Sequence, residues 1–188
     1  ASLPIPEIRA HQETVSLLKA PLFSLENTNA SSFVATEEDA LKRLKQFCYE
    51  SVPHYAKWRD IPAVDGTSRL SPYLSVGLLS IRQCFNRLSQ TEPDFLENST
   101  SGAFVWFNEL IWREFYQHLI VANPHLCKHI AFQLWTEKIN WRNEQDEFNA
   151  WTQGLTGFPI IDAAMRQLNQ TGWMHNRLRM LTASFLIK

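Results

Sequence analysis

Three short stretches of the sequence place hydroxyl or charged side chains beside apolar ones, and each could support chemistry. The first is Thr67-Ser68-Arg69-Leu70-Ser71-Pro72, in which Ser71 and Pro72 suit the N-cap and the first position of a helix. The N-terminus of a helix presents unpaired N–H groups and a partial positive charge. Hydroxyls and an arginine at that point could therefore bind a phosphate. The alternative is an ordinary capped helix that follows a turn.

The second stretch is a helix-like run over residues 106–116. One stripe of it combines aromatic and charged side chains, namely Trp106, Glu109, Arg113 and Tyr116, with Trp112 beside them. Charges on such an apolar helix must be paired or used. Glu109 and Arg113 have the i, i+4 spacing of a helical ion pair and could satisfy each other. Alternatively, a tryptophan beside a carboxylate offers a flat heterocycle a stacking face and polar groups at its edge.

The third stretch is residues 173–180, at the positively charged end of the chain. From residue 151 onward the only negative side chain is Asp162, and the positive ones are Arg166, Arg177, Arg179 and Lys188. This end of the chain could therefore meet phosphate, or its arginines could form a solvated helix face. We expect His175 to be a hydrogen-bonded structural histidine and not a catalyst.

Composition excludes several classes of protein. The 188 residues suit about one domain, and the net charge of -1 excludes a globally basic binder. Six glycines, with no GxGxxG, make glycine-rich phosphate loops improbable. Three scattered cysteines indicate neither a disulfide framework nor a metal site, and no apolar run is long enough for a membrane span. The seven tryptophans are explained by a core of large side chains or by roles in stacking or electron transfer.

The elements that must position these residues are expected to be helices, so the predicted fold class is all-α. No segment alternates with period two for long, whereas apolar residues recur at helical spacing. Helices are predicted to begin at Thr36, after Ser80, near residue 102, at Pro159 and near Trp173. Asn123-Pro124 should stop the third of these, and a tryptophan-rich connection should follow over residues 125–152.

Two regions are expected from this pass along the chain. Residues 1–35, with three prolines and a polar stretch, indicate a lead-in arm or linker, and residues 36–188 indicate a helical domain. The chain opens at Ala1 and stops at Lys188 inside an apolar pattern. We therefore expect a piece of a longer protein.

Four motifs of the chain, in order, closely resemble the photolyase/cryptochrome family, in particular its bacterial cyclobutane-dimer photolyases. They are residues 67–71, 108–116, 156–166 and 173–180. The resemblance implies the first part of an all-helical FAD-binding domain, without the antenna domain and its chromophore and without the C-terminal part. It also implies a carbon–carbon lyase that repairs cyclobutane pyrimidine dimers in DNA by electron transfer from reduced FAD.

The resemblance carries roles over to particular residues. FAD would be held by Tyr55, Thr67, Ser68, Arg69, Leu70, Ser71, Trp106, Glu109, Arg113, Asn176 and Arg179. DNA would be met by Glu109, Leu110, Ile111, Trp112, Arg113, Glu114, Phe115, Tyr116, Asn176, Arg177, Leu178 and Arg179. The resemblance gives catalytic roles to Glu109, which would hydrogen-bond the flipped dimer, to Trp112, which would stack on it, and to Met180, which would lie against it. It places Asn176 near flavin N5 and makes Trp141 the outer member of an electron-transfer chain.

Further expectations concern the intact protein and its rivals. We expect a monomer in the bacterial cytoplasm whose partner is DNA containing pyrimidine dimers, and no membrane association. The 188 residues alone should be inactive, with FAD absent or weakly held. One rival function is a cryptochrome-like photoreceptor on the same fold, and the other is a cofactor-free helical module that binds DNA or protein.

Overall fold

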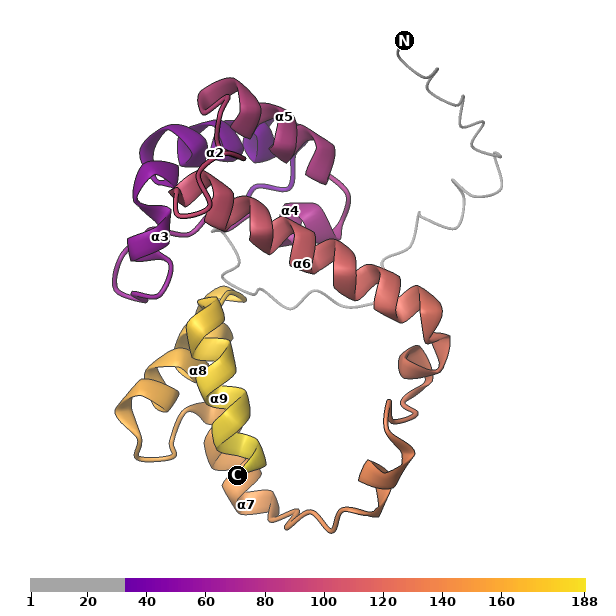
Figure 1. The fold of residues 1–188 in the computed structure, drawn as a ribbon. Coiled ribbons are helices and arrows are strands. Elements are labelled where there is room, and N and C mark those ends of the chain that lie inside the picture. The colour runs from indigo at the N-terminus through magenta and orange to yellow at the C-terminus, as the bar shows by residue number, and fades with distance from the viewer. Residues whose placement is uncertain (1–32) are drawn as a thin grey trace, which may run out of the picture.

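The computed structural model describes residues 33–188, whose regular secondary structure is all helical, with no strand among them. The all-α prediction is therefore confirmed for this part of the chain. The expected arm over residues 1–35 lies almost wholly outside the described residues. Two groups of helices, α2–α6 and α7–α9, are joined by a long connection that runs from the end of α6 to the start of α7 (Figure 1).

Three helices of the first group begin where the sequence predicts, at Thr36, after Ser80 and near residue 102. It comprises α2 (Glu37–Glu50), η1 (Val52–His54), α3 (Tyr55–Trp58), α4 (Ser71–Ser75), α5 (Ile81–Thr91) and α6 (Gly102–Ala122). Thr36 caps α2 by accepting from Asp39 N–H, and Ser80 and Gln83 form a capping box at the start of α5. Asn123 ends α6 before Pro124, as predicted. Helices α2 and α5 thus begin where a side chain satisfies a free backbone N–H group.

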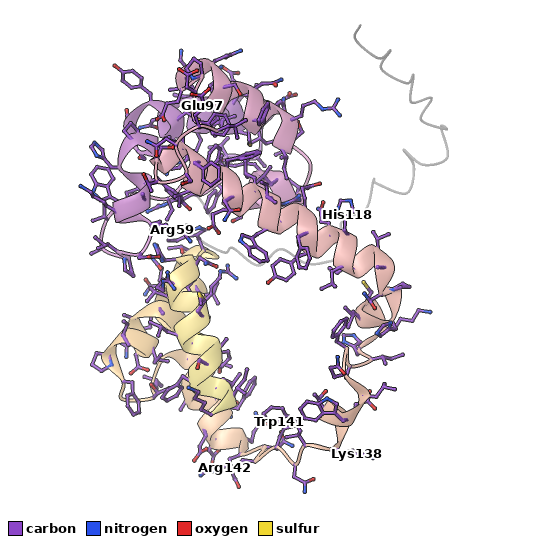
Figure 2. All side chains as sticks on the ribbon, in the orientation of Figure 1. Arg59, Glu97, His118, Lys138, Trp141 and Arg142 are labelled. Atoms are coloured by element: carbon purple, nitrogen blue, oxygen red, sulfur yellow. The ribbon has the colours of Figure 1, made fainter. Side chains whose placement is uncertain are left out.

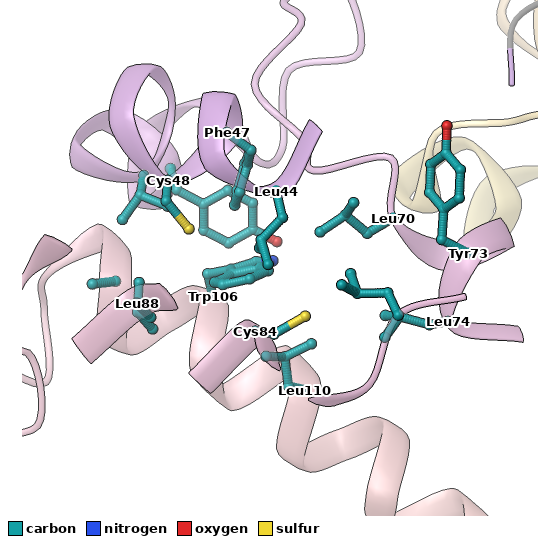
Figure 3. Packing of buried hydrophobic residues seen from close by; sticks show 14 of the residues in the cluster. Leu44, Phe47, Cys48, Leu70, Tyr73, Leu74, Cys84, Leu88, Trp106 and Leu110 are labelled. Carbon is teal, nitrogen blue, oxygen red and sulfur yellow. The ribbon is translucent and has the colours of Figure 1, made fainter. Parts of the chain in front are cut away.

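The core of the first group forms where α2, α5 and α6 meet (Figure 3). Phe47 on α2 lies against Trp106 on α6, with their ring centroids 5.0 Å apart. Burial of each such large apolar side chain contributes about 1.5–3 kcal/mol. Cys48 and Cys84 are buried here, and burial raises the pKa of their thiols to about 12 and about 11. Both stay protonated and act as small apolar side chains.

The connection between the groups contains η2 (Pro124–Lys128) and η3 (Leu134–Lys138), and then α7 (Gln145–Gln153), α8 (Pro159–Thr171) and α9 (Asn176–Ile187) form the second group. The connection predicted up to residue 152 is shorter in the structure, because α7 begins at Gln145. The expected start of the last helix near Trp173 is also early, since His175 is the N-cap of α9. Ile161, Met165 and Met174 form the small core of this group.

A buried carboxylate organises the turn between α7 and α8. Asp162 accepts hydrogen bonds from the N–H of Thr156 (2.8 Å), from the Thr156 hydroxyl (2.6 Å) and from the N–H of Gly157 (3.0 Å). The pKa of Asp162 is lowered by the Thr156 side chain first and by the two backbone donors after it. Gly154, at φ +67, provides the left-handed residue that ends α7. The motif over residues 156–166 thus has a structural role in this turn.

The two helical groups meet at the N-terminal end of α9, which lies close to α3 (Figure 1). There Arg177 is paired with Asp60, and the Arg69 guanidinium lies 4.7 Å from the centroid of the Trp173 ring. No helix within residues 33–188 combines the length and hydrophobicity that crossing a bilayer requires.

Candidate functional site

A cavity of about 650 Å³ lies between the two helical groups. Its wall is formed by α3 and the loop that follows it, by α4, by one face of α6, and by residues 172–179. This volume is within the range of about 300–1,000 Å³ that is typical of small-molecule sites. Five arginines line it against two carboxylates, Asp60 and Glu109. The cavity therefore suits an anionic ligand.

The loop over residues 67–71 contributes its hydroxyl groups and Arg69 to the cavity wall. The predicted N-cap is one residue off: Leu70 occupies that position, α4 has only five residues, and no side chain caps it. Arg69 adopts a left-handed backbone with φ 53, and its Nε lies 3.1 Å from Asp65. Anion binding at this point therefore depends on the loop and its arginine, because so short a helix has little dipole.

Arg43, on α2, supports this loop from outside the cavity. Its Nε donates to the carbonyl of Ser68 (3.0 Å) and its Nη2 to the carbonyl of Thr67 (3.2 Å). Arg43 does not line the cavity. It therefore satisfies two carbonyl groups of the loop without occupying the space where an anion would lie.

On α6, Glu109 and Arg113 pair with other residues, and not with each other as their spacing predicts. Glu109 does not pair with Arg113: its carboxylate lies 2.8 Å from Nη1 of Arg59. Arg113 instead donates to the carbonyl of Leu74 (3.1 Å) and to Glu114 (3.3 Å). The helical pair is replaced because α3 packs on α6 and brings Arg59 to Glu109. Both α6 residues line the cavity.

Two aromatic residues close the cavity floor. Trp106 is 3% exposed and Tyr55 is 7% exposed, and both pack on Phe47. Burial raises the pKa of Tyr55 to about 12, and the nearby Glu109 raises it further than Arg59 lowers it. The phenol therefore stays neutral and can donate a hydrogen bond into the cavity.

The start of α9 forms the opposite wall. His175 is buried and caps the helix, because its Nδ1 accepts the N–H of Arg177 at 3.1 Å. Burial lowers the pKa of this histidine, although the carboxylate of Asp60 acts in the other direction. This agrees with the expected structural role. Asn176 is exposed at the first position of the helix, and Arg179 donates from Nε to the carbonyl of Met174 (3.3 Å).

An aromatic cluster lies on the exposed face of α6 outside the cavity wall. Trp112, Phe115 and Tyr116 are each about half exposed, and their ring centroids lie 5.4–6.1 Å apart. Exposed aromatic faces of this kind can stack on unpaired bases.

The cavity collects most of the residues that the sequence singles out, but not all of them. Those that line it are Tyr55, Thr67, Ser68, Arg69, Leu70, Ser71, Trp106, Glu109, Leu110, Arg113, Asn176, Arg177 and Arg179. Those that lie outside its wall are Ile111, Trp112, Glu114, Phe115, Tyr116, Leu178 and Met180. Trp141 lies near α7, away from Arg59 and the cavity, and is 52% exposed (Figure 2).

Sequence reasoning missed Arg59 and Asp60, which lie in a turn-rich segment without periodicity. Arg59 pairs with Glu109, and Asp60 accepts from Arg177, 117 positions further along the chain. The only local signal is a pair of adjacent opposite charges after α3, which is common on protein surfaces. The place of Arg59 and Asp60 in the site depends on contacts with distant residues, which the sequence does not reveal.

Comparison with known proteins finds DNA photolyases among the relatives of this chain. Residues 106–188 match the family described as the FAD binding domain of DNA photolyase. The deoxyribodipyrimidine photo-lyase of Escherichia coli (strain K12) is 52% identical over 160 residues, which are 85% of this chain and 34% of that protein. The enzyme of the same name from Salmonella typhimurium is 48% identical over 99% of this chain and 39% of its own length.

Solved structures agree. A class III photolyase from Agrobacterium tumefaciens matches with a TM-score of 0.80 at 34% identity, over 100% of this chain and 38% of its own. A cryptochrome from Synechocystis sp. matches with a TM-score of 0.70 at 28% identity, over 88% of this chain and 34% of its own. The chain thus spans little more than a third of the length of these relatives.

Proposed function

Since this chain belongs to the photolyase/cryptochrome family, we propose that the whole protein is a deoxyribodipyrimidine photo-lyase that repairs cyclobutane pyrimidine dimers in DNA. The observation that carries the proposal is the cavity between the helical groups, in which Glu109 and five arginines meet the loop over residues 67–71. We further propose that the enzyme is a monomer of the bacterial cytoplasm and that residues 36–188 are part of its FAD-binding domain.

The residues of the cavity fit FAD. A diphosphate needs cationic and hydroxyl donors, and Thr67, Ser68, Ser71 and Arg69 supply both on one loop. Arg113 and Arg179 add positive charge from α6 and α9. The aromatic wall at Tyr55 and Trp106 suits the flat ring systems of the cofactor. When bound and reduced, FAD supplies the light-driven electron that splits the cyclobutane ring.

The chain's own residues would bind and orient the lesion. Photolyases are among the enzymes that extrude their target nucleotide from the duplex. The carboxylate of Glu109, at the cavity wall, can accept hydrogen bonds from the N–H groups of an extruded pyrimidine. The exposed ring of Trp112 can stack on the same bases, and Met180, exposed on α9, can offer a soft apolar contact.

The DNA backbone would be met by the rim of the cavity. Arg177 and Asn176 lie at the start of α9, and the aromatic cluster lies on the exposed face of α6. Phosphate contacts position a duplex, whereas the extruded bases carry the recognition. An arginine for phosphate contacts and a stacking surface are thus present on the two helices that border the cavity.

The test uses the intact protein purified with its cofactor. We expect visible flavin absorbance, tighter binding to a duplex that contains a thymine dimer than to the same duplex without it, and splitting of the dimer only under illumination. Flavin binding with no preference for the damaged duplex would favour a photoreceptor instead. A protein without flavin absorbance would favour a cofactor-free helical module.

A further inference from the structure

Four side chains of alternating charge are linked in series along the wall of the cavity. Glu109 on α6 lies 2.8 Å from Arg59, whose Nε lies 3.7 Å from the carboxylate of Asp60. The same carboxylate oxygen of Asp60 accepts from both Nε (3.2 Å) and Nη2 of Arg177, on α9. Asp60 thus connects the residue proposed to hold the lesion with an arginine at the proposed DNA face.

The pair of Asp60 and Arg177 is only partly buried. Their side chains are 53% and 39% exposed. Ion pairs with such exposure usually add little to stability. The pair does hold the guanidinium in one direction, and it lowers the pKa of Asp60, first through the hydrogen bond from Arg177. Asp60 is therefore charged whenever DNA is bound at neutral pH.

A carboxylate and a DNA phosphate compete for the same edge of a guanidinium, because both present anionic oxygens to the N–H donors in its plane. Arg177 already gives its Nε and Nη2 to Asp60. A phosphate that approaches this arginine must displace the carboxylate or share the guanidinium with it. Either event costs part of the energy that the new contact gains.

We propose that Asp60 competes internally with DNA phosphate for Arg177 and thereby limits how tightly the protein binds DNA. The inference rests on the proposed function. Loss of the ion pair costs the same free energy whichever duplex contacts Arg177. An undamaged duplex has only backbone contacts to set against this cost, whereas a duplex whose extruded dimer enters the cavity also gains contacts with Glu109 and the stacking surface. Asp60 therefore keeps undamaged DNA weakly bound, while damaged DNA still binds.

The experiment compares the full-length protein with FAD bound against Asp60→Asn, which removes the charge and keeps the shape. Affinity for an undamaged duplex and for the same duplex with one thymine dimer is measured over a range of salt concentrations. Asp60→Glu keeps the charge and serves as the rescue variant. Glu97→Gln removes one exposed negative charge on the far side of the first helical group and is the matched control (Figure 2).

We expect Asp60→Asn to bind undamaged DNA about two- to fivefold more tightly, the range for release of one exposed ion pair. The slope of log K against log salt should steepen by about 0.9, which corresponds to one more neutralised phosphate. Affinity for the damaged duplex should rise by the same factor, the flavin content should stay equal, and both Asp60→Glu and Glu97→Gln should behave like the wild type.

An unchanged salt slope for Asp60→Asn would overturn the inference. Equal weakening on both duplexes together with loss of flavin would also overturn it, because Asp60 would then serve only to join the two helical groups. Should Asp60→Asn not fold, Asp60→Ser is measured in the same way. If the wild type binds both duplexes equally, the proposed function fails, and the slope on undamaged DNA still decides whether Asp60 competes for Arg177.

Discussion

Arg43 and Ser68 are 25 positions apart in the sequence, yet the Nε of Arg43 donates to the carbonyl of Ser68 over 3.0 Å. A second bond from Arg43 reaches the carbonyl of Thr67 at 3.2 Å. The loop proposed to hold the cofactor's phosphates is thus fixed by a side chain that never enters the cavity. Its shape depends on α2 as much as on its own residues.

Replacement of Arg43 by Leu should loosen this loop. Hydrogen bonds from a charged donor are worth about 1.5–3 kcal/mol each when buried, and Arg43 is partly exposed, so we expect a total loss of about 1–3 kcal/mol. Thermal unfolding of the intact protein and the rate of flavin loss measure it. Lys42→Leu, at the neighbouring exposed position of α2, is the control. Flavin retention equal to that of the wild type would show that the loop holds its shape alone.

Replacement of Trp112 by Ala should weaken binding of dimer-containing DNA by about 1–3 kcal/mol, the range for stacking on one base. Flavin content should change little, because Trp112 lies outside the cavity wall. Fluorescence anisotropy with damaged and undamaged duplexes measures the change. Tyr49→Ala removes an aromatic ring that is 81% exposed on α2 and should leave binding unchanged. Unaltered affinity of the Trp112 variant for damaged DNA would exclude stacking.

The helices could be predicted because their signals are local. Thr36 and Ser80 cap helices through groups within three positions, and Pro124 and Gly172 mark ends that depend on one residue each. Helix α7 was not predictable in this way, since no side chain caps its start and its aromatic residues stay partly exposed.

The partners of the site residues could not be predicted, because they come from distant parts of the chain. The i, i+4 spacing of Glu109 and Arg113 favours a local pair, yet Arg59 takes Glu109 once α3 packs on α6. Asp60 and Arg177 are 117 positions apart, and neither segment carries a sequence signal that predicts their contact. The motifs predict which types of residue form the site. Which of these residues pair with one another is determined by how the helices pack.

Trp141 gives a test of the electron-transfer role that the family resemblance implies. In the intact protein, Trp141→Phe should slow light-driven reduction of oxidised flavin, because phenylalanine is much harder to oxidise. Repair that starts from reduced flavin should persist. Transient absorption and a repair assay with pre-reduced protein separate the two. Trp135→Phe, at a side chain 66% exposed in the same connection, is the control. Loss of both activities would mean that Trp141 is only structural.

Asp162 predicts how stability depends on pH. Its folded-state pKa is lowered by Thr156 and by the N–H of Gly157, whereas an unfolded aspartate titrates near about 3.9. The stabilisation is therefore fully present above that value and is lost as the pH falls below it through the folded pKa. We expect Asp162→Asn to lower the melting temperature at about pH 7 and to converge with the wild type only as the pH falls through the lowered folded-state pKa. Asp94→Asn, at an exposed loop position, is the control. A difference that persists unchanged at acid pH would show that the geometry of the turn, and not the charge of Asp162, stabilises it.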